Sequence, residues 1–392
     1  MGFNTFQYEL YFAGMGGKVP DLPVTYDALE AAAREVLDDR AFGYVAGSAG
    51  AERTAAANRQ AFARWRFVPR MLVDVAERDL DVELFGRTLP APLLAGPVGV
   101  QSIVHPEGEK AVARALASLG LPSILSTVSS FPLEEVAEAA GDGPRWFQLY
   151  WPAEDPVTDS LVQRAADAGY EAVVITLDTR LLAWRPRDLA TAYLPFLHAE
   201  GLANYLTDPT FTAGVAEPNE HLSEQQAAVM RWIQVFSDPS QTWQHLHDFC
   251  ARSPLPVLVK GIQHPDDARL AIDAGVVGLV VSNHGGRQVD NAIGSLDALP
   301  GVVEAVGGTV PVLFDSGVRS GADAAVAIAL GARAVLIGRP WVWGLALAGE
   351  EGVRHVFRCL LADLDLTLAL AGIPSVAGLT RDVLVRADTP TG

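Results

Sequence analysis

Short apolar runs recur along the chain at a spacing that fits a parallel sheet. Residues 277–281 and 310–314, for example, are almost uninterrupted strings of apolar and β-branched side chains. Strands that are buried on both faces have this composition in parallel sheets. The pattern predicts eight strands, at residues 91–99, 122–129, 145–151, 171–179, 255–262, 277–285, 310–318 and 334–342.

Helical patterns lie between most of these strands. Apolar residues recur there at intervals of three and four, which is typical of a helix with one buried face. Eight alternating units favour a closed (β/α)8 TIM barrel over an open doubly wound sheet, so the predicted fold class is α/β. The predicted helices cover residues 107–119, 133–140, 155–168, 265–274 and 321–330, and glycines suited to helix ends follow at Gly120, Gly169, Gly275 and Gly331.

Two segments do not follow this repeat. Residues 1–90 precede the first strand and read as a helical extension, with helices at 26–37 and 55–65. Residues 180–254 form a long insertion after the fourth strand, and segments of this length are usually lids or binding loops. We expect residues 213–226 to be its most mobile part. The chain is then in effect one domain, in which residues 1–90 pack on a barrel of residues 91–392.

The composition narrows the class of protein. The chain has 392 residues, of which 49% are hydrophobic and 19% are charged, so one large packed domain is expected. Its formal net charge of -18 argues against nucleic acid or an anionic membrane as a partner. The two cysteines, Cys250 and Cys359, do not suggest a disulfide framework or a thiolate metal site.

The sequence also argues against export, membrane insertion and metal binding. We expect neither a signal peptide nor a transmembrane helix, and hence a soluble cytoplasmic protein. His245 and His247 are two residues apart, so on a helix they would point to nearly opposite sides. No metal site is expected.

Polar and ionisable residues cluster where the predicted strands end. The active site of a TIM barrel lies at the carboxyl ends of its strands. Ionisable groups at nearly every strand end would each need to be paired or desolvated, which favours a catalytic face over a structural one. In strand order the candidates are Pro97, Val98 and Gly99; Ser126; Gln148 and Tyr150; Thr176 and Asp178; Lys260; Ser282, His284 and Arg287; Asp315, Gly317 and Arg319; Gly338 and Arg339.

The last two strands suggest a phosphate site. Glycine and arginine follow both of them, in residues 315–321 and 337–340, which is the usual phosphate position of this fold. The alternative is two ordinary left-handed turns beside surface arginines. The occurrence of both loops together at this place favours phosphate.

Residues 282–288 are the most specific stretch. A histidine after a buried strand is often only a hydrogen-bonded core residue. Here two glycines follow His284 and allow a ligand to approach the backbone closely. Arg287 is suited to bind a carboxylate with two hydrogen bonds, and Asp178 is suited to hold the imidazole.

These motifs resemble the FMN-dependent 2-hydroxy acid oxidase and dehydrogenase family, and the similarity runs essentially end to end. Within the family the match is best to its lactate 2-monooxygenase branch. The matching segments are residues 44–47, 58, 69–72, 148–150, 175–179, 184–188, 204–205, 207–209, 260–265, 282–288, 315–321 and 338–340.

The resemblance implies a role for each candidate. His284, paired with Asp178, would be the base that removes the substrate proton; Arg185 and Arg287 would bind the substrate carboxylate; and Tyr44 and Tyr150 would donate hydrogen bonds to the substrate. Lys260 would stabilise negative charge on the reduced flavin. The implied FMN-binding residues are Pro97, Val98, Gly99, Ser126, Gln148, Thr176, Lys260, Ser282, Asp315, Gly317, Arg319, Gly338 and Arg339.

The expected reaction follows from this branch: lactate and O2 give acetate, carbon dioxide and water. The alternatives are an oxidase that releases keto acid and hydrogen peroxide, acting on lactate or an aryl analogue such as mandelate; a dehydrogenase with another electron acceptor; and a flavin-binding protein without turnover. We expect Gly99 to leave a methyl-sized space beside the flavin, and Val128 replaces a tryptophan of many oxidases.

The expected oligomer is a homotetramer or a homo-octamer.

Overall fold

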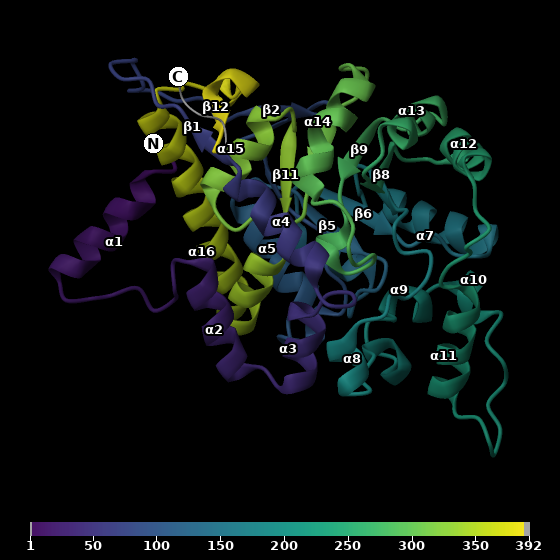
Figure 1. The fold of residues 1–392 in the computed structure, drawn as a ribbon. Coiled ribbons are helices and arrows are strands. Elements are labelled where there is room, and N and C mark those ends of the chain that lie inside the picture. The colour runs from purple at the N-terminus through teal and green to yellow at the C-terminus, as the bar shows by residue number, and fades with distance from the viewer. Residues whose placement is uncertain (1, 388–392) are drawn as a thin grey trace.

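The computed structural model describes residues 2–387 and shows a closed barrel of eight parallel strands (Figure 1). Around the barrel the strands follow the order β10-β11-β4-β5-β6-β7-β8-β9. The predicted α/β TIM barrel is therefore confirmed, and each predicted strand contains one barrel strand. Their bounds are Leu93–Ala95 (β4), Ser123–Ser126 (β5), Arg145–Leu149 (β6), Val173–Thr176 (β7), Val257–Ile262 (β8), Gly278–Val281 (β9), Val312–Phe314 (β10) and Ala334–Ile337 (β11).

The strands are shorter than the apolar runs that predict them. In the fourth run, β7 ends at Thr176, and Asp178 and Thr179 already lie in the following loop. The carboxyl ends of the runs are buried or half-buried because they face the site at the mouth of the barrel. Burial there does not require a continued strand.

Side chains at alternate strand positions fill the barrel interior. They form a cluster that includes Trp146, Leu258 and Leu313. A hairpin of β2 (Val82–Leu84) and β3 (Arg87–Leu89) adds further apolar side chains to this cluster, and its Phe85 packs edge-on against Trp146 at the start of β6. The amino-terminal end of the barrel is thus plugged, which leaves the carboxyl ends of the strands for chemistry.

Helices surround the barrel and bury the outer faces of its strands in a second, larger apolar cluster. All five predicted helices are present, and the four predicted helix-ending glycines have positive φ. The surrounding helices are α5 (Gly108–Ser118), α6 (Leu133–Ala140), α7 (Asp155–Asp167), α12 (Trp243–Arg252), α13 (Pro265–Asp273), α14 (Ser295–Val306), α15 (Gly321–Ala329) and α16 (Arg339–Ala371), the last broken at Ala348 and Gly349.

The helices of the N-terminal extension are α1 (Thr5–Met15), α2 (Tyr26–Val36), α3 (Asp39–Ala46) and α4 (Arg53–Ala63), and the extension also contains three short strands. Helices α2 and α4 are those predicted. Helix α3 is an addition, since its eight residues include a glycine and give too short a pattern to detect. The side chain of Asp38 accepts a hydrogen bond from the Ala41 amide and so caps its first turn.

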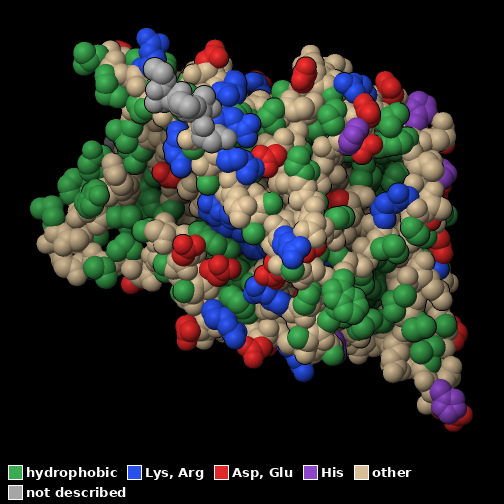
Figure 2. Space-filling view, in the orientation of Figure 1, with side chains coloured by type: hydrophobic (Ala, Val, Ile, Leu, Met, Phe, Trp, Pro, Cys, Tyr) green, Lys and Arg blue, Asp and Glu red, His purple; other side chains and the backbone are tan. Residues whose placement is uncertain are grey.

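Helix α1 projects from the body of the molecule (Figure 1), and apolar side chains are exposed on this projection (Figure 2). Tyr11 is 68% exposed, Phe12 66% and Met15 84%. Only Phe6 of this helix is buried, and Glu9 pairs with Arg358 of α16. Isolated exposed apolar residues are common, but a continuous group of this kind usually marks a contact surface.

The insertion after β7 is largely helical. It contains α8 (Pro186–Ala190), a short turn at Pro195–His198, α9 (Ala203–Leu206), α10 (Pro209–Thr212) and α11 (Glu224–Val235), and it then supplies α12 of the outer ring. Helix α8 packs against α3 of the N-terminal extension (Figure 1). Mobility of residues 213–226 stays a prediction.

Two short strands link distant parts of the chain outside the barrel. Strand β1 (Trp65–Phe67) pairs antiparallel with β12 (Leu384–Arg386).

Among the described residues, no helix is long and apolar enough to cross a membrane.

Candidate active site

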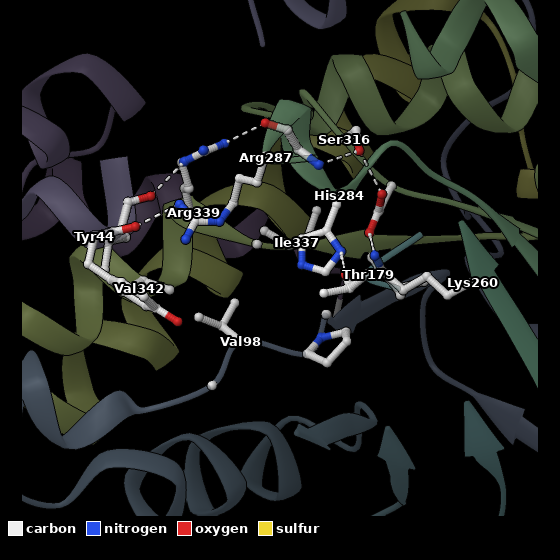
Figure 3. A pocket seen from close by; sticks show the side chains of 18 of the residues that line it. Tyr44, Val98, Thr179, Lys260, His284, Arg287, Ser316, Ile337, Arg339 and Val342 are labelled. Carbon is white, nitrogen blue, oxygen red and sulfur yellow. Dashed lines mark hydrogen bonds and ion pairs between the residues drawn. The ribbon is translucent and has the colours of Figure 1, made fainter. Parts of the chain in front are cut away.

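A pocket at the carboxyl ends of the strands collects most of the predicted site residues (Figure 3). Asp178, Ser126, Gln148, Thr176 and Ser282 do not line this pocket but lie in the layer behind it, bonded to one another or to residues that do. The predicted residues that line it are Tyr44, Pro97, Val98, Gly99, Tyr150, Arg185, Lys260, His284, Arg287, Asp315, Gly317, Arg319, Gly338 and Arg339.

His284 and Asp178 form a buried pair. The Nδ1 atom of His284 lies 2.8 Å from Oδ1 of Asp178 and 3.3 Å from the hydroxyl of Thr179. Burial lowers the pKa of His284, although the Asp178 carboxylate acts in the opposite direction. Burial alone would raise the pKa of Asp178, but the charges of His284 and Lys260 hold it below its usual value. The imidazole is thus oriented through Nδ1, and Nε2 remains available as a base.

Two guanidinium groups reach the same pocket from different loops. Arg287 donates to the carbonyls of Tyr44 and Gly47, at 2.6 and 2.7 Å. Arg185 donates to the carbonyl of Arg287, at 3.0 Å, and to Oε1 of Gln288, at 2.7 Å. Burial, together with the charge of Arg185, lowers the pKa of Arg287 to about 10. The Oδ2 atom of Asp188 lies 4.0 Å from Nη1 of Arg185, so one carboxylate faces two adjacent buried cations. The remaining positive charge forms a site for an anion.

Two tyrosines complete this part of the pocket. Tyr44 comes from α3, and its ring lies 5.1 Å from the guanidinium of Arg287. Tyr150 follows β6, and its ring lies 6.5 Å from that of His284. Burial raises the pKa of both phenols, so both stay protonated and able to donate a hydrogen bond.

Lys260 of β8 is a buried cation held by two neighbours. Its Nζ atom donates to the Ser282 hydroxyl at 2.9 Å and lies 3.1 Å from Oδ2 of Asp315. Burial would lower the pKa of Lys260, but the charges of Asp315 and Asp178 raise it above its usual value. Lys260 therefore places a fixed positive charge at the pocket wall.

A chain of hydrogen bonds crosses three neighbouring strands behind the pocket. The Ser126 hydroxyl donates to Oε1 of Gln148, and Nε2 of Gln148 donates to the Thr176 hydroxyl, both at 2.9 Å. All three side chains are buried. The strand register places Ser126 beside Gln148, so the sequence pattern and the fold together produce this polar row.

Arg319 and Arg339 lie at the end of the pocket formed by the loops after β10 and β11. Arg339 is bonded to the carbonyls of Val45, Gly47 and Gly285 and to the Ser48 hydroxyl, with no carboxylate partner among them. Burial lowers the pKa of Arg339 to about 9 and also lowers the pKa of Arg319. A Cβ atom on Gly338 would meet open space, which leaves the backbone there accessible. These features fit the phosphate of a nucleotide.

The structure corrects the expectation for Gly99. A Cβ atom at this position would lie 2.5 Å from Cγ2 of Val128 and 2.9 Å from its carbonyl oxygen. The side of Gly99 that an alanine methyl would occupy is therefore filled by Val128. No methyl-sized space exists there, and the residue is glycine because the two backbone segments approach closely.

Sequence reasoning misses several residues around the site. Gln288 accepts from Arg185 and donates to the carbonyl of Asp178, at 2.7 Å in each case. Phe196 and Phe236 of the insertion, with Leu182, give the pocket its apolar wall. No local pattern distinguishes these residues, since their position depends on how the insertion folds back over the barrel.

Comparison with known proteins decides the family. The family model described as FMN-dependent dehydrogenase matches residues 33–386. The chain belongs to this family. FMN is therefore its cofactor, and it is an oxidoreductase.

Among residues 2–387, no group of three or more His, Cys, Asp or Glu side chains is placed to hold a metal ion.

Three relatives show how far the similarity extends. An FMN-dependent alpha-hydroxy acid dehydrogenase of Penicillium citrinum is 44% identical, over 100% of this chain and 98% of its own. An L-lactate oxidase of Lysinibacillus sphaericus is also 44% identical, over 98% of each chain. The crystal structure of a mandelate oxidase with (S)-4-hydroxymandelic acid has a TM-score of 0.82 and 40% identity, covering 93% of this chain and 99% of that one.

Proposed function

We propose that this FMN-dependent oxidoreductase oxidises L-2-hydroxy acids and releases the keto acid together with hydrogen peroxide. The observation that carries the proposal is the convergence of the His284–Asp178 pair with the Arg185 and Arg287 guanidiniums in one pocket. The relatives with oxidase names, one for lactate and one for mandelate, support release of peroxide better than the monooxygenase reaction. A space beside Gly99 would help the site to retain the keto acid, as a monooxygenase must, but Val128 fills it.

Substrate binding follows from charge. The substrate carboxylate would sit against Arg185 and Arg287, where two guanidiniums can each offer parallel N–H groups. The phenols of Tyr44 and Tyr150 would donate hydrogen bonds to its oxygens. Phe196, Phe236 and Leu182 would face the remaining substituent, so an apolar side chain on the substrate is favoured over a charged one.

Proton removal is assigned to His284. Oxidation of the alcohol carbon releases two electrons and two protons, and Nε2 of His284 would take one of these protons. Asp178 stabilises the imidazolium that results, because its carboxylate lies 2.8 Å from Nδ1. The lowered pKa of His284 keeps the free base neutral near pH 7.

The residues around the pocket fit FMN. When bound, FMN supplies the acceptor for the two electrons. Arg319, Arg339, Gly317 and Gly338 would hold its phosphate, and Asp315 its ribityl chain. The remaining predicted residues, Pro97, Val98, Gly99, Ser126, Gln148, Thr176, Lys260 and Ser282, would surround its ring system.

A product assay distinguishes the oxidase from the monooxygenase. Purified FMN-loaded protein is supplied with L-lactate or L-mandelate in air, with and without catalase. The proposal expects keto acid and peroxide in equal amounts, and consumption of O2 halved by catalase. Acetate or benzoate formed in the presence of catalase at the rate of substrate loss would instead establish the monooxygenase. No flavin reduction by any 2-hydroxy acid would overturn the proposed function.

We also propose that the chain assembles into a homotetramer or homo-octamer, and the exposed apolar side chains of α1 support this. A small 2-hydroxy carboxylate and O2 are its proposed partners in the reaction.

A further inference from the structure

Ser316 has an unusual backbone conformation for its residue type. It lies between Asp315 and Gly317 in the loop after β10, and its φ is +87°. Residues other than glycine rarely adopt a φ in this region, because it strains the backbone. Backbone strain of this kind is commonly found at functional sites. Glycine would adopt this φ without strain, as the neighbouring Gly317 does. What the serine adds is a hydroxyl group that can form hydrogen bonds.

The hydroxyl of Ser316 makes three contacts, although it lies outside the set of residues expected from the sequence (Figure 3). It accepts a hydrogen bond from the amide of Gly285, at 3.0 Å, and a longer one from the amide of Asn283, at 3.4 Å. It donates to Oδ1 of Asp315, at 2.7 Å. Gly285 and Asn283 flank His284 on both sides. One hydroxyl thus joins the backbone around the base to the Asp315 carboxylate.

These contacts belong to a closed ring of hydrogen bonds. The other oxygen of Asp315, Oδ2, lies 3.1 Å from Nζ of Lys260. Lys260 donates to the Ser282 hydroxyl at 2.9 Å, and that hydroxyl accepts from the amide of His284 at 3.0 Å. The ring therefore runs from the His284 turn through Ser316, Asp315, Lys260 and Ser282 and returns to the same turn.

We propose that Ser316 is a positioning residue that sets the His284 base and the Lys260 charge relative to each other. Its hydroxyl fixes the turn that carries His284 and, at the same time, orients the Asp315 carboxylate that holds Lys260. The proposal rests on the proposed function for the roles of His284 and Lys260. It adds a residue that lines the pocket and that acts through both the His284 turn and Lys260.

The conformation of His284 explains why the turn needs this support. His284 itself has a positive φ of +57°, and Gly285 and Gly286 follow with +66° and +81°. The turn has two backbone hydrogen bonds of its own, from Gly286 to Asn283 and from Arg287 to His284, and the amide of Gly285 takes part in neither. The Asn58–Asn283 side-chain pair holds one side of it, and the Ser316 hydroxyl holds the amide of Gly285.

The test compares Ser316→Gly with Ser316→Ala. Glycine removes the hydroxyl and relieves the strained φ, whereas alanine removes the hydroxyl and keeps the strain. We expect Ser316→Gly to be as heat-stable as the parent or more so, yet to reduce its flavin with a 2-hydroxy acid at least 10-fold more slowly without O2. Leu72→Gly is the matched control, because Leu72 also has positive φ (+58°) but is fully exposed and does not line the pocket.

Two readouts do not need turnover. The midpoint potential of bound FMN should become more negative in both Ser316 variants, because Lys260 loses its fixed position beside the flavin. In the FMN-free protein, amide hydrogen exchange of a peptide covering residues 283–287 should become faster. Parent values for the exchange, the potential and the reduction rate in folded Ser316→Gly would overturn the proposal.

The exchange and potential measurements also separate this proposal from the proposed function. If the parent protein oxidised no 2-hydroxy acid, the proposed function would fail, but changed exchange and potential in the variants would still establish that Ser316 couples the turn to Lys260. A lower melting temperature in Ser316→Ala than in Ser316→Gly would identify the strain that the hydroxyl offsets in the parent.

Discussion

At the scale of single residues, the proposed catalytic pair depends on its surroundings more than on its spacing in the sequence. His284 and Asp178 lie 106 residues apart, and the barrel brings their side chains to 2.8 Å. Two influences then act on the imidazole in opposite directions. Burial favours its neutral form and the carboxylate favours its charged form, and the net pKa is lowered.

This balance predicts the acid side of the pH profile. Protonation of His284 removes the base, so kcat/KM should fall as the pH drops through a pKa that lies below the ordinary value of 6.5. Asp178→Asn removes the carboxylate that raises this pKa, so the fall should move to still lower pH. A plot of kcat/KM against pH for both proteins checks this. An unchanged midpoint in a folded Asp178→Asn variant would contradict it.

The same reasoning predicts the effect of replacing the base. His284→Asn should retain FMN and bind substrate but reduce the flavin about 10²–10⁴-fold more slowly. Anaerobic stopped-flow spectroscopy gives the rate directly. Thr179→Val is a useful comparison, since it removes a 3.3 Å contact to the ring but leaves the base in place. Reduction of His284→Asn at the parent rate would remove His284 from this role.

The arginine pair gives a prediction about affinity. Arg185→Lys keeps the charge but cannot donate both to Arg287 and to Gln288 while binding a carboxylate. Hydrogen bonds to charged groups contribute about 1.5–3 kcal/mol, so substrate KM should rise roughly 10- to 150-fold. Arg187→Lys is the matched control, because Arg187 is half-exposed and pairs with Glu52. Equal KM values for the two variants would exclude Arg185 from carboxylate binding.

At the scale of elements, Arg180 ties the start of the insertion, just after β7, to the later loop at residues 237–241. Its guanidinium donates to the carbonyls of Pro239 and Gln241, and its own carbonyl accepts from the Ser237 hydroxyl at 3.1 Å. Phe236 comes directly before this loop and packs against Tyr150, with ring centroids 5.3 Å apart. The loop thus holds part of the apolar wall of the pocket in place.

Loss of this tie should loosen the loop. Arg180→Met removes the hydrogen bonds to the carbonyls of Pro239 and Gln241. The substrate KM should therefore increase several-fold, and a protease should cleave residues 237–242 faster. Limited proteolysis followed by mass spectrometry of the fragments measures the second effect. Arg252→Met, which breaks exposed ion pairs with Asp155 and Asp159, should leave both quantities near the parent values. Identical cleavage of both variants would argue against the tie.

The elements also show what a sequence can reveal. The barrel strands are predictable because burial on both faces leaves apolar runs, and His284 and Arg287 stand out because glycines surround them. The apolar pattern does not reveal helix α3, and Tyr44 is identified as a site residue only through the family resemblance. Gln288 and Ser316 carry no local mark, since their roles come from hydrogen bonds between loops that lie far apart in the chain. The space expected at Gly99 is absent for the same reason, because Val128 fills it from the loop after β5.

At the scale of the whole molecule, α1 stands out because it projects from the body and buries only Phe6. Apart from Glu9 it carries no charge, and Tyr11, Phe12 and Met15 are all more than half exposed. Proteins with a net charge of -18 repel one another, so an uncharged apolar projection is a place where two copies can meet at low electrostatic cost.

Removal of these side chains should weaken assembly. The combined variant Tyr11→Ser, Phe12→Ser and Met15→Ser should form smaller oligomers than the parent at the same concentration, as measured by sedimentation velocity. The helix should persist, since Phe6 and the Glu9–Arg358 ion pair are untouched. Leu370→Ser changes an exposed apolar residue on α16 and serves as the control. An unchanged oligomer in the triple variant would exclude α1 as the contact.

The pairing of β1 with β12 has a consequence for the order of events during synthesis. Trp65–Phe67 emerges from the ribosome early, but its partner, Leu384–Arg386, is made more than 300 residues later. Helix α3 likewise waits for Arg287 and Arg339, whose guanidiniums bind its carbonyl groups. At a rate of about 5–20 residues per second, the early segments stay without these partners for about 15 to 60 seconds. The N-terminal extension therefore reaches its final place only after translation is nearly complete, and this interval is when a chaperone would find it exposed.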